Sequence, residues 1–297
     1  MATPAVTRSP RGRRNRPRGA ERPGRGTLLL LTPPMLWLGV AYLGALGALF
    51  ITSLWQQNDF TGAIERVWTL DNFRDLFTID VYRTITFRTI AIAALVTVVD
   101  ALLAFPIALY MAKVASPRLQ RLLVISVLMP LWASYLVKAY AWRGMLSENG
   151  LIAWLGAPFG IDTPGYGLPA TTIVLAYLWL PYMILPIYAG LERLPDSLWE
   201  ASADLGGGAW TTLRRVVLPM AFPAIVAGSI FTFSLSLGDY IAVRIVGGTS
   251  QLLGNVVYDN VGAANNLPFA AAVATIPVVV MVIYLAAARR TGALENL

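Results

Sequence analysis

The sequence predicts an all-α polytopic membrane protein with six transmembrane helices, and three observations carry this prediction. Of the 297 residues, 57% are hydrophobic and 13% are charged, whereas about a quarter of the residues in a soluble domain are charged. The mean hydropathy is +0.62. Several apolar segments reach the roughly 20 residues that a helix needs to cross a bilayer. These values exclude a disordered chain and argue against a water-soluble globule.

The predicted spans follow one another along the chain with polar or turn-rich connections between them. Membrane strands explain them less well, because such strands alternate polar and apolar residues and runs such as Ala91–Val99 do not. The first span has the flanks of a signal peptide, but its apolar stretch is about twice the length of a signal core, which favours a retained helix. The predicted spans cover residues 28–54, 89–112, 122–142, 170–190, 216–237 and 268–288.

The first 26 residues differ from the rest of the chain in composition. They contain eight arginines and one acid, Glu21, and so account for the whole net charge of +7. This composition predicts a disordered cytoplasmic tail over residues 1–26 and a membrane domain over residues 27–297. Because the remaining charges balance, no basic face is expected on a folded domain, and we expect membrane lipid but no nucleic acid as a partner.

The distribution of Lys and Arg predicts that both termini of the multi-pass chain lie in the cytoplasm. With the N-terminus inside, the cytoplasmic segments carry 16 basic residues and the opposite side carries seven. Without the tail the numbers are 8 and 7, so the tail decides the orientation. An even number of spans then returns the C-terminus to the cytoplasm.

The chain contains neither cysteine nor histidine. This excludes disulfides, Cys/His metal sites and His-based catalytic triads. The two lysines, Lys113 and Lys138, do not follow glycines, so a phosphate-binding loop is absent from the sequence. We therefore expect no catalytic residue, no metal site and no cofactor on this chain. If ATP is used, another subunit must bind it.

One cytoplasmic connection has a helical pattern of its own. Pro195 suits the first turn of a helix, and Gly206 suits the left-handed conformation that follows a last turn. A second short helix over residues 209–217 leads to Pro219, which opens the next span. The sequence thus predicts a helix–turn–helix over residues 195–219, called the hairpin below.

The hairpin resembles the coupling signature of ABC importer permeases, EAA-x(3)-G-x(9)-I-x-LP. The spacing is intact, with Ser202 in place of the second alanine and Val216 in place of isoleucine. The resemblance implies the type I importer permease fold and a hairpin that docks on a separate ATPase, with Gly206 setting the turn. The alternative is an amphipathic interfacial hairpin. The residues assigned to coupling are Glu200, Ala201, Ser202, Leu205, Gly206, Leu218 and Pro219.

A narrower resemblance, to the first of the two spermidine/putrescine-type permeases, covers nearly the whole chain after residue 27. It rests on Thr69–Phe73, Pro130–Trp142, Glu148–Gly150 and Leu237–Tyr240, with Lys138 where an arginine is usual. It implies inward transport of a polyamine across the plasma membrane, although iron, phosphonate and other organic-ion permeases share versions of these motifs. The implied partners are an ATPase dimer that holds ATP and Mg, a second homologous permease and an extracytoplasmic binding protein.

Polar and aromatic residues near the spans are candidates for the substrate pathway. A charge at the middle of a span, such as Asp100, costs about 2.5–3.5 kcal/mol on insertion scales and should face protein or water. It fits a pathway carboxylate for a cation or a structural partner. Asp239 fits the pathway, a helix cap or an ion pair with Arg244. Aromatic side chains fit a cation–π lining or an interfacial belt. The pathway candidates are Asp100, Trp132, Tyr135, Tyr177, Asp239 and Tyr240.

Three other functions are compatible with a six-span protein. An ion-driven secondary transporter would not need the coupling signature. An intramembrane enzyme is disfavoured by the missing histidine and cysteine. A membrane scaffold subunit would bind partners without substrate-dependent ATPase activity.

Overall fold

The computed structural model describes residues 25–58 and 60–291. The predicted tail therefore lies outside the described residues, apart from its last two positions. The chain divides into two contact units, Met1–Ala48 and Leu49–Leu297, and each is described by itself. The prediction of an all-α membrane protein is confirmed.

The described part of the first unit is helical. Helix α1 (Arg25–Leu38) continues through a π-helix, η1 (Gly39–Leu43), into α2 (Gly44–Ser53), whose last residues belong to the second unit. The apolar stretch Leu30–Ser53 is 24 residues long, enough to cross a bilayer. It corresponds to the first predicted span.

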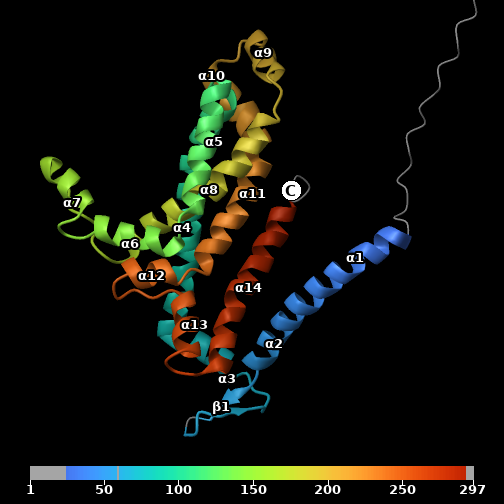
Figure 1. The fold of residues 1–297 in the computed structure, drawn as a ribbon, viewed down its shortest axis with the longest axis vertical. Coiled ribbons are helices and arrows are strands. Elements are labelled where there is room, and N and C mark those ends of the chain that lie inside the picture. Colours follow the sequence, from blue (N-terminus) through green and yellow to red (C-terminus); the bar gives the residue numbers. More distant parts are fainter. Residues whose placement is uncertain (1–24, 59, 292–297) are drawn as a thin grey trace, which may run out of the picture. The chain divides into compact units, whose positions relative to one another are not determined.

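Long helices that run side by side form the body of the second unit (Figure 1). Helices α4 (Asp80–Lys113), α8 (Leu168–Glu192) and α11 (Leu218–Leu237) pack against one another, and α14 (Leu267–Arg289) packs against α11. Their close packing depends on small residues at some crossings. A Cβ atom on Gly228 of α11 would lie 3.2 Å from the Cα atom of Met183 on α8.

The third predicted span, 122–142, is not a straight helix. Helix α5 (Pro117–Trp132) and helix α6 (Tyr135–Met145) meet at an angle of 94°. Ala133 and Ser134 are extended between them. Pro130 weakens the last turn of α5 because it has no N–H to donate. Within the described residues, five helices qualify as spans by length and composition, and the bent pair makes a sixth if it counts as one span.

The fifth span begins earlier than predicted. Residues 209–237 form one helical stretch of 29 residues, made of α10 (Ala209–Thr212), a π-helix, η3 (Leu213–Val217), and α11. The predicted second helix of the hairpin is thus continuous with the span. The π-helical turn ends two residues before Pro219, which has no N–H for a regular helical hydrogen bond.

Short elements occupy the two ends of the bundle (Figure 1). Helix α9 (Ser197–Asp204) lies with α10 at one end, called the hairpin end below. Helices α3 (Asp71–Thr78) and α13 (Leu253–Val261) lie at the opposite end, called the loop end. The remaining short elements are α7 (Leu151–Gly156), η2 (Ala157–Phe159), α12 (Ile241–Val246) and a two-stranded antiparallel pair, β1 (Gln56–Gln57) and β2 (Ile64–Glu65), in which Gln56 faces Glu65.

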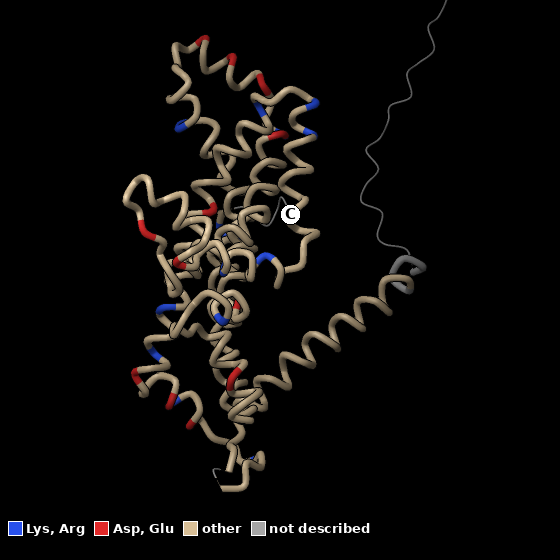
Figure 2. The backbone as a smooth tube through the Cα atoms, turned by 60° about the vertical axis from the view of Figure 1, so that its left-hand side comes forward, with Lys and Arg blue, Asp and Glu red and all other residues tan. Residues whose placement is uncertain are grey.

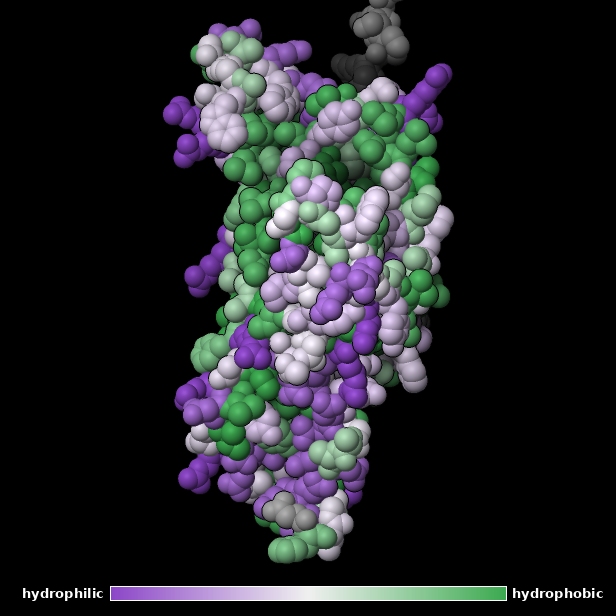
Figure 3. Space-filling view, turned by 90° about the vertical axis from the view of Figure 1, so that its left-hand side faces the viewer, coloured by the Kyte–Doolittle hydropathy of each residue, from purple (hydrophilic) through white to green (hydrophobic). Residues whose placement is uncertain are grey.

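Charge and hydropathy follow the membrane-spanning pattern. Most of the length of the long helices carries no Lys, Arg, Asp or Glu (Figure 2). On the face seen in Figure 3, hydrophilic side chains are densest at the loop end, and hydrophobic ones spread over the body above it. Asp100, in α4, departs from this pattern.

Candidate functional site

The turn of the hairpin is built around two glycines. Gly206 takes the left-handed conformation, with φ of +76°, as its position after the helix predicts. Its N–H donates to the Ala203 carbonyl (2.8 Å), and the Gly207 N–H donates to the Ser202 carbonyl (2.8 Å). This pair of bonds is the Schellman motif, which ends a helix and satisfies its last carbonyls. The direction in which the chain leaves α9 is thereby defined.

A side-chain hydrogen bond joins the two helices of the hairpin. The Ser202 and Thr212 hydroxyls lie 2.7 Å apart. Thr212 is buried, and its hydroxyl also contacts the Gly208 carbonyl at 3.2 Å. Serine in place of the signature's second alanine therefore has a visible role here, since alanine could not make this bond.

The tip of the hairpin is free of the bundle, and its base is packed. Leu205 is 89% exposed, and Glu200, Ala201 and Gly206 are exposed as well. Apolar side chains at the base, Leu194, Trp199 and Leu213, pack against the core formed by α4, α8 and the start of α11. Of the other coupling candidates, Ser202 is half-buried, and Leu218 and Pro219 are exposed at the start of α11.

Asp100 is fully buried within the bundle. Its exposed fraction is 0%, and α4, which carries it, packs on α8 and α11. Among the residues that the structure describes, its two carboxylate oxygens have no hydrogen-bond partner, and the same holds for Trp179 Nε1 and Ser236 Oγ. An unpaired buried carboxyl group is costly, so this position needs an explanation beyond packing.

Asp239 connects two elements near the end of α11. Its Oδ1 accepts the Ala242 N–H at 2.9 Å, which caps the start of α12, and its Oδ2 accepts the Tyr135 hydroxyl from α6. Burial raises the pKa of the Asp239 carboxyl, while the hydrogen bonds from Tyr135 and from backbone N–H groups act in the opposite direction. Of the roles considered for Asp239, helix capping is the one that its contacts show.

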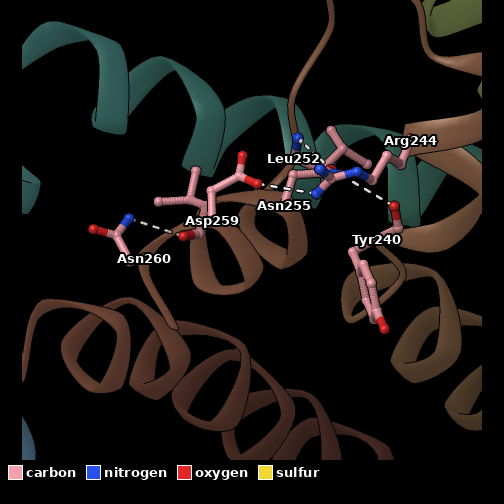
Figure 4. A network of polar contacts seen from close by, with 7 residues as sticks. Tyr240, Arg244, Leu252, Asn255, Asp259 and Asn260 are labelled. Carbon is pink, nitrogen blue, oxygen red and sulfur yellow. Dashed lines mark hydrogen bonds and ion pairs between the residues drawn. The ribbon is translucent and has the colours of Figure 1, made fainter. Parts of the chain in front are cut away.

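Arg244, proposed from the sequence as a partner of Asp239, pairs with a different acid. Figure 4 shows the network of α12 and α13, in which Arg244 Nη1 lies 3.0 Å from Asp259 Oδ1. Asn255 Nδ2 donates to the Tyr240 carbonyl at 3.1 Å. The Tyr240 ring stacks on Tyr258 with centroids 4.9 Å apart. These partners had no distinguishing signal in the sequence, because they are ordinary polar residues of a short helix, α13.

The aromatic pathway candidates differ in their surroundings. Tyr135 packs near Trp179, with ring centroids 5.9 Å apart, and Tyr177 near Trp142, at 5.3 Å. Trp132, at the end of α5, is 85% exposed. Tyr240 lines a mainly apolar cavity of about 400 Å³ between the end of α11, α13 and α14. The structure thus joins Tyr135 to Asp239, packs Tyr135 and Trp142 against one apolar core cluster, and leaves Trp132 exposed.

Replacing Asp239 with alanine should destabilise the region around α12. The cap and the acceptor for Tyr135 are both lost, at a cost of about 1–3 kcal/mol. The measurement is the apparent melting temperature of the purified chain in detergent, with Asp259→Ala as the matched control. Asp259 is partly exposed in its ion pair, so its loss should cost less than about 1 kcal/mol. Equal shifts for the two variants would refute the capping role.

Comparison with known proteins identifies the family. Residues 104–291 match the family described as binding-protein-dependent transport system inner membrane component. The chain belongs to this family. It is therefore the permease subunit of an ABC importer, a transport subunit of the inner membrane, as the hairpin signature predicted.

Two relatives cover most of the permease. The inner membrane ABC transporter permease protein YdcU of Escherichia coli K12 is 44% identical over 294 residues, which is 93% of this chain and 92% of that protein. The spermidine/putrescine transport system permease protein PotB of Haemophilus influenzae is 30% identical over 233 residues, 77% of this chain and 81% of that protein.

Solved structures share the fold. A chain of the bacterial alginate ABC transporter, in complex with its alginate pentasaccharide-bound periplasmic protein, superposes with a TM-score of 0.69 at 15% identity, covering 90% of this chain and 94% of that chain. A chain of the MetNI methionine ABC transporter gives 0.54 at 19% identity, with 70% and 92% covered. The permease therefore has the type I importer fold.

Proposed function

We propose that the permease moves a polyamine such as spermidine or putrescine, or a related small organic cation, into the cell by alternating access. The observation that supports this cargo is the 30% identity to a spermidine/putrescine permease over 77% of the chain. The more similar relative is named only as an ABC permease. Another solute, such as iron, a phosphonate or another organic ion, is the alternative.

In the proposed mechanism, the hairpin transmits the free energy of ATP binding and hydrolysis to this permease. A separate ATPase dimer holds ATP and Mg, and its closure displaces the exposed tip around Glu200, Leu205 and Gly206. The packed base carries that displacement into α8 and α11. A second, homologous permease completes the pathway, and an extracytoplasmic protein delivers the substrate. Both termini and the hairpin then lie in the cytoplasm.

The cargo and the energy source are tested together in proteoliposomes. The permease, its ATPase, its second permease and its binding protein are reconstituted, and uptake of radiolabelled spermidine, putrescine, ferric iron and a phosphonate is measured. The proposal expects polyamine uptake that requires ATP and persists when ionophores dissipate ion gradients. Uptake that follows an ion gradient without ATP would instead support a secondary transporter. Selective uptake of iron or a phosphonate would reject the polyamine.

Asp100 is proposed as a pathway carboxylate that becomes accessible during the transport cycle. Its burial without a partner supports this role, because a cation passing between the helices would supply the missing counter-charge. Asp100→Asn keeps the side-chain volume and removes the charge. We expect polyamine uptake to fall about tenfold, by analogy with the loss of a charged hydrogen bond, while assembly of the complex stays normal.

The matched control for Asp100 is Ser236→Ala, which removes a second buried polar atom without a partner. This variant should transport normally, because no charge is lost. Unchanged uptake in Asp100→Asn would return Asp100 to a structural role. Equal losses in the two variants would show that uptake responds to any change in the bundle interior.

A further inference from the structure

We propose that Lys113 is a positioning residue that ties the base of the hairpin to α4, so that α4 and the hairpin move as one body. The inference rests on the proposed coupling role of the hairpin and names the link by which that motion enters the bundle. Lys113 is the last residue of α4. The segment that it reaches connects α8 to α9, more than 80 residues away in the sequence.

The contacts of Lys113 join the end of α4 to the connection between α8 and α9. Its Nζ atom donates to the Leu194 carbonyl at 2.7 Å and to Asp196 Oδ1 at 2.8 Å. The Lys113 side chain is only 12% exposed, whereas that of Asp196 is 83% exposed. The ion pair with Asp196 is therefore screened by water, and the shielded bond to the backbone carbonyl makes the larger contribution.

The position of this ammonium group also suits the helix ends around it. The C-terminal carbonyls of a helix carry partial negative charge, which a cation stabilises. Lys113 lies in the last turn of α4 and, at the same time, reaches the carbonyl of Leu194, two residues after α8 ends. The Lys113 side chain, at the end of α4, thus bonds the segment that follows α8. Apolar packing of Leu194 against the core holds the same segment from its other side.

Polar contacts fix the base of the hairpin and the neighbouring helix ends, whereas the tip of the hairpin is not fixed. A second polar link joins α5 to α8, where Gln120 Nε2 donates to the Tyr188 hydroxyl at 2.8 Å and Tyr188 donates to Glu192 at 3.1 Å. The tip at Leu205 is exposed. Without the Lys113 bond, the short connection between α8 and α9 could bend when the tip is displaced, and the displacement would not reach α4. With the Lys113 bond, displacement of the tip also moves α4.

The first test compares uptake with ATP hydrolysis in the complete reconstituted complex. For Lys113→Met we expect ATP hydrolysis stimulated by the loaded binding protein to stay within about twofold of the unmodified complex, and radiolabelled spermidine taken up per ATP to fall about tenfold, as for a lost charged hydrogen bond. Lys113→Arg should restore most of the uptake, because a guanidinium can donate to the same carbonyl. If hydrolysis and uptake fall in proportion, the residue is merely structural and the inference is wrong.

Two control variants separate the buried bond from the loss of charge. Arg121→Met removes a cation from the same end of the bundle, but the Arg121 side chain bonds the Pro117 carbonyl of its own helix, so coupling should be normal. Asp196→Asn removes only the exposed ion pair and should change uptake by less than about twofold. If either control uncouples as strongly as Lys113→Met, net charge rather than the tie is responsible, and the inference fails.

A second test needs no knowledge of the cargo. The chain has no cysteine, so spin labels can be placed at Tyr110→Cys on α4 and Ala203→Cys on α9, both exposed positions. In the assembled complex, the labels should give one population of distances, with and without ATP. Lys113→Met should add a second population. Identical distances in both backgrounds would overturn the inference. If Gly206→Pro leaves uptake normal, the coupling role itself is wrong. If Gly206→Pro is inactive and Lys113→Met is normal, only this inference fails.

Discussion

Replacing Gly206 with proline is expected to abolish substrate uptake while the permease still inserts into the membrane. The φ of Gly206 is +76°, whereas proline is restricted to about −65°. Proline also removes the N–H that donates to the Ala203 carbonyl. The turn cannot keep its conformation, so movement of the ATPase would no longer be transmitted to the bundle in a defined direction. Uptake is measured per inserted chain, with the amount of chain in the membrane determined by immunoblot.

A matched pair of valine variants separates conformation from bulk. A Cβ atom would meet nothing within 4 Å at Gly206 or at Gly208, so neither valine is excluded by crowding at the backbone. Gly208 has φ of −71°, which any residue adopts, whereas the left-handed conformation costs a side chain about 1–2 kcal/mol. Gly206→Val should therefore impair uptake, and Gly208→Val should leave it near normal. Similar uptake in the two variants would contradict the proposed role of the turn.

Replacing Gly228 with valine is expected to prevent correct packing of the bundle. A Cβ atom there would lie 2.8 Å from Met183 Sδ and 3.2 Å from the Met183 Cα atom and carbonyl oxygen. The sulfur could move, but the backbone of α8 could not without separating the two helices, and overpacking of this kind costs about 1–3 kcal/mol or more. The apparent melting temperature in detergent and the yield of monodisperse protein should both fall strongly.

The control for Gly228 is Gly144→Val on α6. That glycine is also helical, and a Cβ atom on it would have nothing within 4 Å. The change should therefore shift the melting temperature little, since only intrinsic helix propensity differs. Comparable loss of folded protein in both variants would show that the close approach of α8 and α11 does not decide stability.

Hydropathy located the spans because the free energy of burying a helix in lipid depends mainly on its composition. The bend between α5 and α6 was missed for the same reason. Residues 122–142 are apolar on both sides of Ala133 and Ser134, and a hydropathy average does not register a change of direction. A proline such as Pro130 permits a bend, but the sequence does not give its size, which is 94° in the structure.

The hairpin was predictable because its signals are local. A helix, its terminating glycine and the following proline lie within 25 residues. The glycine and the proline each influence the backbone at their own positions. The continuity of α10 with α11 was not predictable, because a π-helical turn compensates for Pro219 there. The bond between Ser202 and Thr212 also needed the structure, since it forms only once the turn brings two helices together.

The amino-acid sequence by itself determined the class of the protein, the number and approximate positions of its apolar segments and the conformation of Gly206, because these depend on composition and on neighbouring residues. Only the tertiary structure decided the partners of the polar groups. Asp239 bonds to Tyr135, 104 positions earlier in the chain, rather than to the nearby Arg244, and Lys113 reaches the connection between α8 and α9. Such pairings depend on how helices distant in sequence pack together, and no local pattern specifies that packing.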